Sequence, residues 1–364
     1  MPEWLFWVVI LVPLSAAGLF ALVMVAAHFY YRLKFGDQIV RIFEEKPLFI
    51  IPRGDRVADA EEVSFRAVDG TLLRGCYLPH RGAYRKGVIL FGLEFGSNRW
   101  ASVPYCARLR DAGYDIFAYE PRNQGESETD PNYRPLQWVT DKDVADARAA
   151  LAYLKDRHDA DPRGVGIFGI SKGGSVGLML AAEDPDVRCV VTDGAFATYS
   201  TMVPYMRRWV NIYSPNRKRL QSLAPDFLYG SIGLAAMKRV AEARRVRFPW
   251  VEAAVRRVRV PVLMIHGQGD TYIKPEMAVA LFDKCGSPDK QLWMVPKAKH
   301  NQGPHVDPDT YFGKLTAFFD AHLARLPDPS DQFGHDPREV LPTPRAVWED
   351  RELAPNPRLA AAAK

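Results

Sequence analysis

The longest apolar stretch of the chain lies at its N-terminus. From Trp4 to Tyr31 there is no Asp, Glu, Lys or Arg, and a helix of about 28 residues, at about 1.5 Å each, exceeds the roughly 30 Å hydrocarbon core of a bilayer. The pattern predicts that residues 1–35 form a transmembrane anchor with its flank. A cleaved signal peptide is the competing interpretation, but the run has no basic segment before it and is too long for the apolar region of such a peptide.

The charges that flank this run predict its orientation. Arg32, Lys34 and Arg41 follow the run, whereas the short segment before it carries only Glu3 and the terminal amine. The positive-inside rule therefore places the C-terminal domain in the cytoplasm. We interpret His28, near the end of the run, as an interfacial residue without a function of its own.

After a linker predicted over 36–59, short apolar runs alternate with helical patterns. Residues 63–79 contain two strand-like runs around Asp69-Gly70, a hairpin signal. Continuous apolar strands separated by helices are typical of a parallel sheet covered on both faces, so we predict a doubly wound, mostly parallel α/β domain over 60–326. The further predicted strands are 87–93, 114–120, 164–169, 187–194, 260–267 and 290–296. The predicted helices are 99–112, 140–158, 172–183, 274–285 and 308–325.

About 65 residues separate the strands predicted at 187–194 and 260–267, too many for a simple crossover. We predict a helical cap inserted at about 196–258, over the pocket. Residues 197–259 hold thirteen Lys or Arg and three acidic residues, so this segment carries about +10 while the whole chain carries +5. A basic segment is often only a solvated face. Beside a membrane anchor it also suits anionic lipid headgroups, whereas no nucleic-acid-binding motif accompanies the charge.

Composition adds two further expectations. Among the 364 residues, four widely spaced cysteines form no Cys-x-x-Cys pair, so we expect reduced thiols and neither a metal site nor a disulfide framework. Residues 327–364 are rich in Pro and charge and poor in periodic apolar positions, and we expect them to be disordered. The composition leaves the oligomeric state open.

The stretch GISKG at 169–173 joins a predicted central strand to a predicted helix. Gly169 and Gly173 leave room for a tight turn, so Ser171 can stand at its apex with the N-terminus of the following helix directed at charge that develops there. One Ser in a Gly-rich turn is more often structural. A serine hydroxyl is also a weak nucleophile at neutral pH, so catalysis requires a base and a group that orients the base.

Two later strand ends supply such groups. Asp270 and His300 each follow one of the last two predicted strands. In a parallel sheet both loops reach the edge at which Ser171 lies. His266 and His305 are nearby alternatives for the base, and we assign the first to structure and the second to the surface.

With its residues in this order, the chain resembles the α/β-hydrolase superfamily, in its serine aminopeptidase or esterase branch, over most of the α/β domain. The resemblance implies that Ser171 is the nucleophile, His300 the general base and Asp270 the group that fixes the imidazole tautomer. The segment YEPRNQGES at 119–127 is similar to another turn of that superfamily, with Glu120 in place of Asp. We interpret this turn as structural.

The oxyanion segment departs from the pattern of the superfamily. Where its members carry H-G-x-G, this chain has Leu-Glu-Phe-Gly. The resemblance implies backbone N–H donors from Phe95 and Lys172, and main-chain donors survive a change of side chain. A carboxylate directed into the hole would oppose the oxyanion, so we expect the Glu94 side chain to turn away, toward Arg99 or Arg122. The alternative is that the pocket works differently.

We therefore predict a membrane-anchored serine hydrolase that cleaves an ester, thioester or amide bond through an acyl-enzyme, without a metal or organic cofactor. The anchor and the basic cap favour an acyl-containing small molecule or lipid as substrate, and a peptide, as for an aminopeptidase, is the alternative. A non-enzymatic membrane scaffold with a decayed site is a second class, which the changed oxyanion segment favours. Close approach of His300 to both Ser171 and Asp270 would favour the enzyme.

Overall fold

A computed structural model describes residues 2–44, 51–213 and 224–324, with the backbone alone for 209–213. These described residues belong to one compact unit of the chain. The segment predicted to be disordered, 327–364, lies outside them. Within the described part all four cysteines are free and buried, as expected for reduced core thiols.

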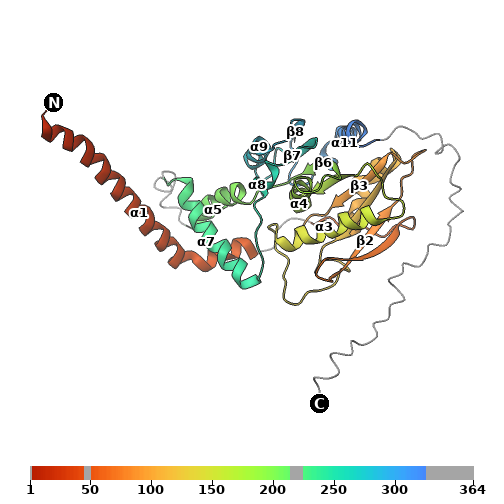
Figure 1. Ribbon diagram of the computed structural model, residues 1–364, viewed down its shortest axis with the longest axis horizontal. Helices are drawn as coiled ribbons and strands as arrows, with labels where there is room; N and C mark the ends of the chain where they lie inside the picture. The colour runs from red at the N-terminus through yellow and green to blue at the C-terminus, as the bar shows by residue number, and fades with distance from the viewer. Residues whose placement is uncertain (1, 45–50, 214–223, 325–364) are drawn as a thin grey trace, which may run out of the picture. The chain divides into compact units, whose positions relative to one another are not determined.

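The centre of the fold is an eight-stranded, mostly parallel sheet (Figure 1). Its strands are β1 (Glu61–Arg66), β2 (Leu72–Leu78), β3 (Gly87–Gly92), β4 (Tyr114–Glu120), β5 (Val165–Ile170), β6 (Val187–Asp193), β7 (Val262–Gly267) and β8 (Lys290–Val295). They lie in the order β1-β2-β4-β3-β5-β6-β7-β8, and β2 alone runs opposite to the other seven. The predicted doubly wound α/β fold and its leading hairpin are confirmed.

Both faces of the sheet are buried. Along β3, Val88 and Leu90 face one hydrophobic cluster, whereas Ile89 and Phe91 face another, as alternate side chains of a strand do. The first face is covered by α3 (Asp141–Asp156), α4 (Lys172–Ala181) and α8 (Val251–Val255), and the second by α2 (Ser102–Asp111) and α11 (Pro308–His322). Burial on both faces explains why the central strands β3, β4, β5 and β7 are apolar at consecutive positions. The short helices around them are η1 (Arg99–Ala101), α9 (Pro275–Lys284) and α10 (Gly303–Val306).

The N-terminal helix is longer than the apolar run that predicted it. α1 (Glu3–Glu44) is continuous through Pro13, and by length and composition it could cross a membrane. It extends into the segment expected to be a linker. Gly36, Ile39 and Phe43 in these last turns are buried, because they pack against other helices of the chain.

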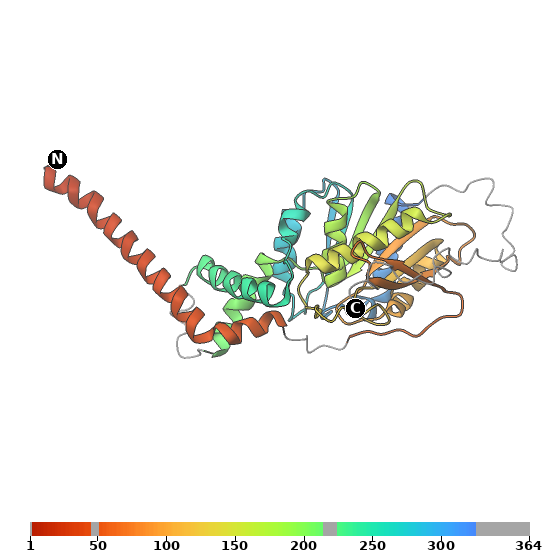
Figure 2. The same ribbon diagram turned by 60° about the horizontal axis from the view of Figure 1, so that its bottom comes forward.

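Two of those helices, α5 (Tyr199–Tyr213) and α7 (Asp226–Arg244), fall within the segment predicted as a cap. Figure 2 shows α7 beside the second half of α1. Side chains of all three helices share one hydrophobic cluster, which includes Phe43, Met206 and Met237. These two helices of the predicted cap, α5 and α7, are therefore packed against the N-terminal helix, and we refer to them as the cap.

Candidate active site

Ser171 lies between β5 and α4, at the carboxyl edge of the sheet. Its backbone has φ 52° and ψ −117°, a conformation that is rare for residues other than glycine. A Cβ at Gly169 would lie 2.5 Å from the Gly173 carbonyl oxygen, and a Cβ at Gly173 would lie 2.3 Å from backbone atoms of Gly92. Only glycine allows strand and helix to approach this closely, so the GISKG stretch forms the tight turn that the sequence predicts.

Ser171, His300 and Asp270 form one hydrogen-bonded series. Ser171 Oγ lies 2.9 Å from His300 Nε2, and His300 Nδ1 lies 2.6 Å from Asp270 Oδ2. Asp270 Oδ1 accepts from the backbone N–H groups of Tyr272 at 2.8 Å and Ile273 at 3.0 Å, which fixes the carboxylate. This arrangement allows the serine hydroxyl to pass its proton to Nε2 while Nδ1–H stays bonded to the carboxylate.

The two alternative histidines occupy other positions. His266 is buried, and its Nε2 donates to the Ile273 carbonyl at 2.7 Å. Burial lowers the pKa of His266, so the ring is held neutral with its donor engaged in a backbone bond. His305 is exposed, in the short helix α10. Both placements agree with the structural and surface roles expected for these histidines.

The predicted oxyanion donors lie on the loop after β3 and at the start of α4. Lys172 is the first residue of α4, and the first N–H groups of a helix have no intrahelical acceptor. Its buried ammonium pairs with Asp143 Oδ1 at 2.7 Å and donates to the Leu136 carbonyl at 2.8 Å. Lys172 is therefore left with its main-chain N–H for the site. A cavity of about 20 Å³, lined by Phe95, Lys172 and eight other residues, has room for about one water molecule beside them.

Glu94 does not take the orientation that we expected. Its Oε2 accepts from Asn301 Nδ2 at 2.8 Å, and Arg99 and Arg122 pair with other carboxylates. The expectation that Glu94 turns toward an arginine is therefore wrong. The physical reason is that Arg99 pairs with carboxylates at and after the end of β4 and Arg122 pairs with two aspartates of other segments. Asn301 directly follows His300 and reaches the end of β3.

Two buried carboxyl groups surround the histidine. Burial raises the pKa of Glu94 to about 7, with the bond from Asn301 and the proximity of His300 opposing the rise. Burial also raises the pKa of Asp193 to about 6, although Tyr311 donates its hydroxyl to the Asp193 carboxylate at 2.8 Å. Near neutral pH these groups can therefore change charge beside the site.

Sequence analysis missed Asn301 and Asp193 as members of this site. Asp193 ends β6, the neighbour of the strand that leads to Ser171, so its position in the sheet was a usable signal. Asn301 has φ 55°, in the left-handed region that Asn tolerates better than most residues. A polar residue next to the predicted base was the only sign of it in the sequence.

The turn predicted at 119–127 is structural. The Glu120 carboxylate accepts from Arg99 Nη1 at 2.8 Å and from the N–H of Glu126 at 2.8 Å. A Cβ at Gly125 would lie 2.1 Å from that carboxylate, so glycine is required there. These bonds fix the conformation of the turn that follows β4, and we assign the turn no reacting group.

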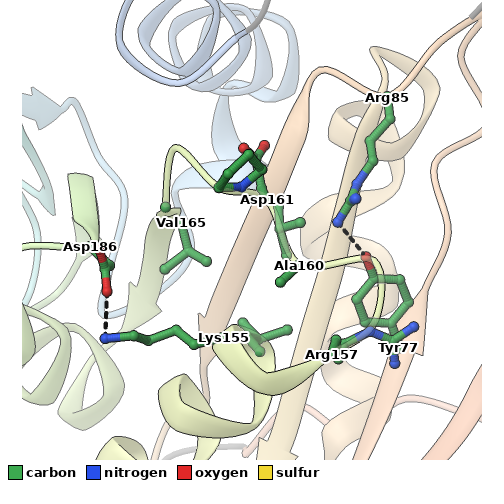
Figure 3. Close-up of a pocket in the computed structure, with 12 residues that line it drawn as sticks. Tyr77, Arg85, Lys155, Arg157, Ala160, Asp161, Val165 and Asp186 are labelled. Carbon is green, nitrogen blue, oxygen red and sulfur yellow. Dashed lines mark hydrogen bonds and ion pairs between the residues drawn. The ribbon is translucent and has the colours of Figure 1, made fainter. Parts of the chain in front are cut away.

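A larger cavity, of about 190 Å³, lies at the opposite edge of the sheet. Figure 3 shows its charged side chains engaged with one another, with Lys155 paired to Asp186 and Arg85 donating to the Tyr77 hydroxyl. Arg157 pairs with a nearby aspartate and a glutamate. This cavity lies apart from Ser171 and takes no part in the site. Among the described residues, no group of three or more His, Cys, Asp or Glu side chains is arranged to hold a metal ion.

Comparison with known families identifies the class of the protein. Residues 86–303, more than half of the chain, match the family described as "Serine aminopeptidase, S33". Together with the sheet order and its helical covering, this match defines a serine hydrolase of the α/β-hydrolase fold, which is an enzyme. The chain belongs to the serine aminopeptidase S33 family. The scaffold alternative is thereby set aside.

Individual relatives are distant but extend over most of the chain. YfhR of Salmonella typhi is 25% identical over 268 residues, which cover 70% of this chain and 77% of that protein. The α/β-hydrolase domain-containing protein WAV2 of Arabidopsis thaliana is 24% identical over 254 residues, covering 68% and 72%. The structure of the Pyrococcus furiosus esterase Pf2001 is similar with a TM-score of 0.56, at 20% identity, over 76% of this chain and 100% of that one. At 20% identity, the similarity to the esterase structure establishes the fold alone.

Proposed function

We propose that the protein is a membrane-anchored serine hydrolase in which Ser171 is the nucleophile, His300 the general base and Asp270 the orienting acid. The series of two hydrogen bonds from Ser171 Oγ through the imidazole to the Asp270 carboxylate carries the proposal. In the proposed mechanism, Nε2 takes the serine proton while Oγ attacks the carbonyl, and Nε2 then returns that proton to the leaving group. Water releases the acyl group in a second, equivalent step.

The proposed oxyanion donors are the N–H groups of Phe95 and Lys172. Lys172 begins α4, so the positive end of the helix dipole adds to its N–H. Glu94 is compatible with this role because its carboxyl group accepts from Asn301 and its pKa is raised to about 7. When protonated, it adds no negative charge beside the oxyanion.

Acyl esters or thioesters are the proposed substrates, with lipid-like acyl groups favoured. A relative described as the thiohydrolase aneE of Aspergillus aculeatus is 30% identical over 134 residues, and a solved structure of similar fold is an esterase. The long apolar helix α1 favours a position at a membrane, either as a span or as a signal anchor. The basic residues that follow it favour a cytoplasmic hydrolase domain.

Removal of an N-terminal residue from a peptide is the second candidate. The description of the family favours it. The buried Glu94 carboxyl group, when it is ionised, carries the negative charge that could pair with a substrate ammonium. The triad itself does not distinguish the two bonds, because specificity lies in the pocket and the cap.

The proposal is tested by labelling the full-length protein in detergent with a fluorophosphonate probe. We expect labelling of the wild type and none of Ser171→Ala or His300→Ala. Ser287→Ala and His305→Ala are matched controls, since Ser287 is buried but donates to Asp289 and His305 is exposed. Both controls should label as the wild type does.

A panel of acyl esters, acyl thioesters and aminoacyl amides then separates the two candidates. Turnover of esters or thioesters that rises with acyl-chain length supports the first, and turnover of aminoacyl amides alone supports the second. A folded wild-type protein that does not react with the probe contradicts the proposed nucleophile.

A further inference from the structure

The two halves of α1 differ in their surroundings. Residues 6–23 are all exposed, although nearly all of them are apolar. From Met24 onward, side chains on one face of the helix are covered in steps of three or four residues and pack into the cluster shared with the cap. These side chains are Met24, Ala27, Tyr31, Phe35, Ile39 and Phe43. The apolar run therefore serves two purposes, since the side chains of its first part are exposed, with one contact to the cap at Phe20, and its last part packs on the cap.

The cap helix α7 runs alongside α1 in the same direction. Phe227 contacts Phe20 edge to face, with ring centroids 6.5 Å apart, and His28 Nδ1 lies 2.9 Å from Ser231 Oγ. His28 is therefore a contact residue of the cap, and its interpretation as an interfacial residue without a function of its own stays a prediction.

Further along the same two helices, charged groups replace these contacts. Arg239 donates to Asp37 at 2.9 Å, and Arg244 donates to Glu44 at 2.8 Å. The contacts therefore advance along both helices together, as expected for two helices that run side by side in the same direction. Figures 1 and 2 show α7 beside the second half of α1.

Length fixes where the pairing begins relative to a bilayer. The apolar, exposed part from Trp4 to Val23 contains about 20 residues, which as a helix span about 30 Å, the thickness of the hydrocarbon core. The start of α7 lies at the end of that part, because Phe227 contacts Phe20. The first turn of α7 is therefore level with the headgroups if α1 spans the membrane.

The side chains at the start of α7 suit that level. Phe227 is 54% exposed, and Arg207 of α5 lies over the Tyr229 ring, 4.6 Å from its centroid, while it pairs with Asp226. Further along α7 the exposed side chains change from Leu234 to Lys238, Arg239 and Glu242. Aromatic and basic side chains are enriched at membrane interfaces, and charged side chains are favoured beyond them.

We infer that the start of α7, with the exposed Phe227 and the adjacent, partly exposed Arg207, is a membrane-contact surface that meets the headgroup zone of an anionic phospholipid bilayer. The bilayer boundary then falls at Val23–Met24, and the cap is the part of the hydrolase nearest the lipid. This inference rests on the membrane-anchoring part of the proposed function. It deepens that function, because an acyl substrate that leaves the bilayer would reach the protein at the cap.

Single added cysteines test the surface in the full-length protein. The four native cysteines are buried, so a thiol-reactive, environment-sensitive dye reports the added one. The series Phe227→Cys, Leu234→Cys and Lys238→Cys samples α7 from its start outward, and Val279→Cys on α9 is the control, since Val279 is also an exposed apolar residue of a helix, at 40% exposure. The protein is placed in phosphatidylcholine–phosphatidylglycerol vesicles that carry a nitroxide at the headgroup.

The expected result is a loss of fluorescence that is greatest at position 227, smaller at 234, small at 238 and equal to the detergent background at 279. The dye at 227 should also be protected from a water-soluble quencher. Equal quenching at 227 and 279 would overturn the inference.

Two parallel measurements separate this outcome from failure of the proposed function. Flotation with vesicles after alkaline extraction reports the anchor, and fluorophosphonate labelling reports the serine. Flotation without quenching at 227 overturns the contact surface alone. A protein that does not float overturns the anchor and the contact surface together, whereas the labelling result stands independently.

Discussion

Two regions of this molecule bury their side chains for different purposes. At the carboxyl edge of the sheet the buried groups are polar, and Ser171, Asp270 and Glu94 are only 6%, 3% and 3% exposed. Between α1 and the cap the buried groups are apolar, with Ile39 and Phe43 at 1% and 0%, and charged pairs lie around them. The first region depends on hydrogen-bond direction, and the second on packed volume.

Because of this difference, we expect substitutions in the first region to change mainly the reaction rate and substitutions in the second to change mainly the stability of the fold. A hydrogen bond at the sheet edge orients a reacting group, so its loss should act on the rate more than on folding. An apolar contact between α1 and the cap has no direction to lose, so truncation should act on stability. Variants in the two regions should therefore give opposite patterns of rate and stability.

The largest expected effect is that of Asp270→Asn. The amide keeps the shape of the side chain but cannot hold the same imidazole tautomer, and comparable changes lower kcat by about 10⁴-fold. Turnover of an acyl ester measures it, with the free energy of unfolding as the second readout. Asp283→Asn, at an exposed position of α9, is the matched control. A variant of Asp270 that keeps a tenth or more of the wild-type rate would falsify its assignment.

Phe43→Ala should give the reverse pattern. Phe43 is fully buried in the cluster shared by α1 and the cap, and truncation of a buried Phe costs about 3–5 kcal/mol. Chemical unfolding in detergent measures the loss. Leu33→Ala on the same helix, at 83% exposure, should have little effect. Fluorophosphonate labelling of the folded Phe43 variant should match the wild type, and equal destabilisation by both variants would contradict the packing described here.

The sheet was predictable because its signals are local. The central strands are short apolar runs between Gly, Pro or charged residues. Their predicted bounds differ from the observed ones by only a few residues, as for 260–267 against Val262–Gly267. The strand order then brings Ser171, Asp270 and His300 to one edge of the sheet. Their roles stay a prediction, but their meeting follows from parallel strands and short loops.

The cap contacts and the Glu94 pair were not predictable in the same way. Ile39 and Phe43 stand four residues apart, which is a helical signal, but their partners on α7 lie about two hundred positions later in the chain. Glu94 and Asn301 are separated by 207 positions. No periodicity in one segment specifies which distant segment it will contact, so only the folded arrangement identifies these partners.

Glu94→Gln should show how far ionisation of this buried carboxyl group lowers the free energy of unfolding. The pKa of Glu94 is raised from 4.5 to about 7 by burial, so the folded state binds more protons than the unfolded state between these values. Stability contributed by this group is therefore complete below about pH 4.5 and lost as the pH rises to about 7, by about 3 kcal/mol in total. Glutamine carries no charge and should be free of this loss.

Chemical unfolding from pH 5 to pH 8 measures the difference between Glu94→Gln and the wild type. The variant should equal the wild type at the acid end and exceed it in stability at the alkaline end. Glu242→Gln, at an exposed position of α7, is the control and should show no such divergence. Parallel curves for Glu94→Gln and the wild type would mean that the carboxyl group is ionised throughout.

The smallest effect should come from the charged rim of the cap contact. Arg244 Nη2 lies 2.7 Å from Glu44 Oε1, and the two side chains are 32% and 24% exposed. Partly exposed ion pairs contribute about 0.2–1 kcal/mol to stability. A double-mutant cycle of Arg244→Ala and Glu44→Ala isolates the coupling, which should shrink at high salt because solvent ions screen it. A coupling as large as the loss from Phe43→Ala would mean that direction, and not packed volume, holds the cap to α1, and the contrast between the two regions would then no longer hold.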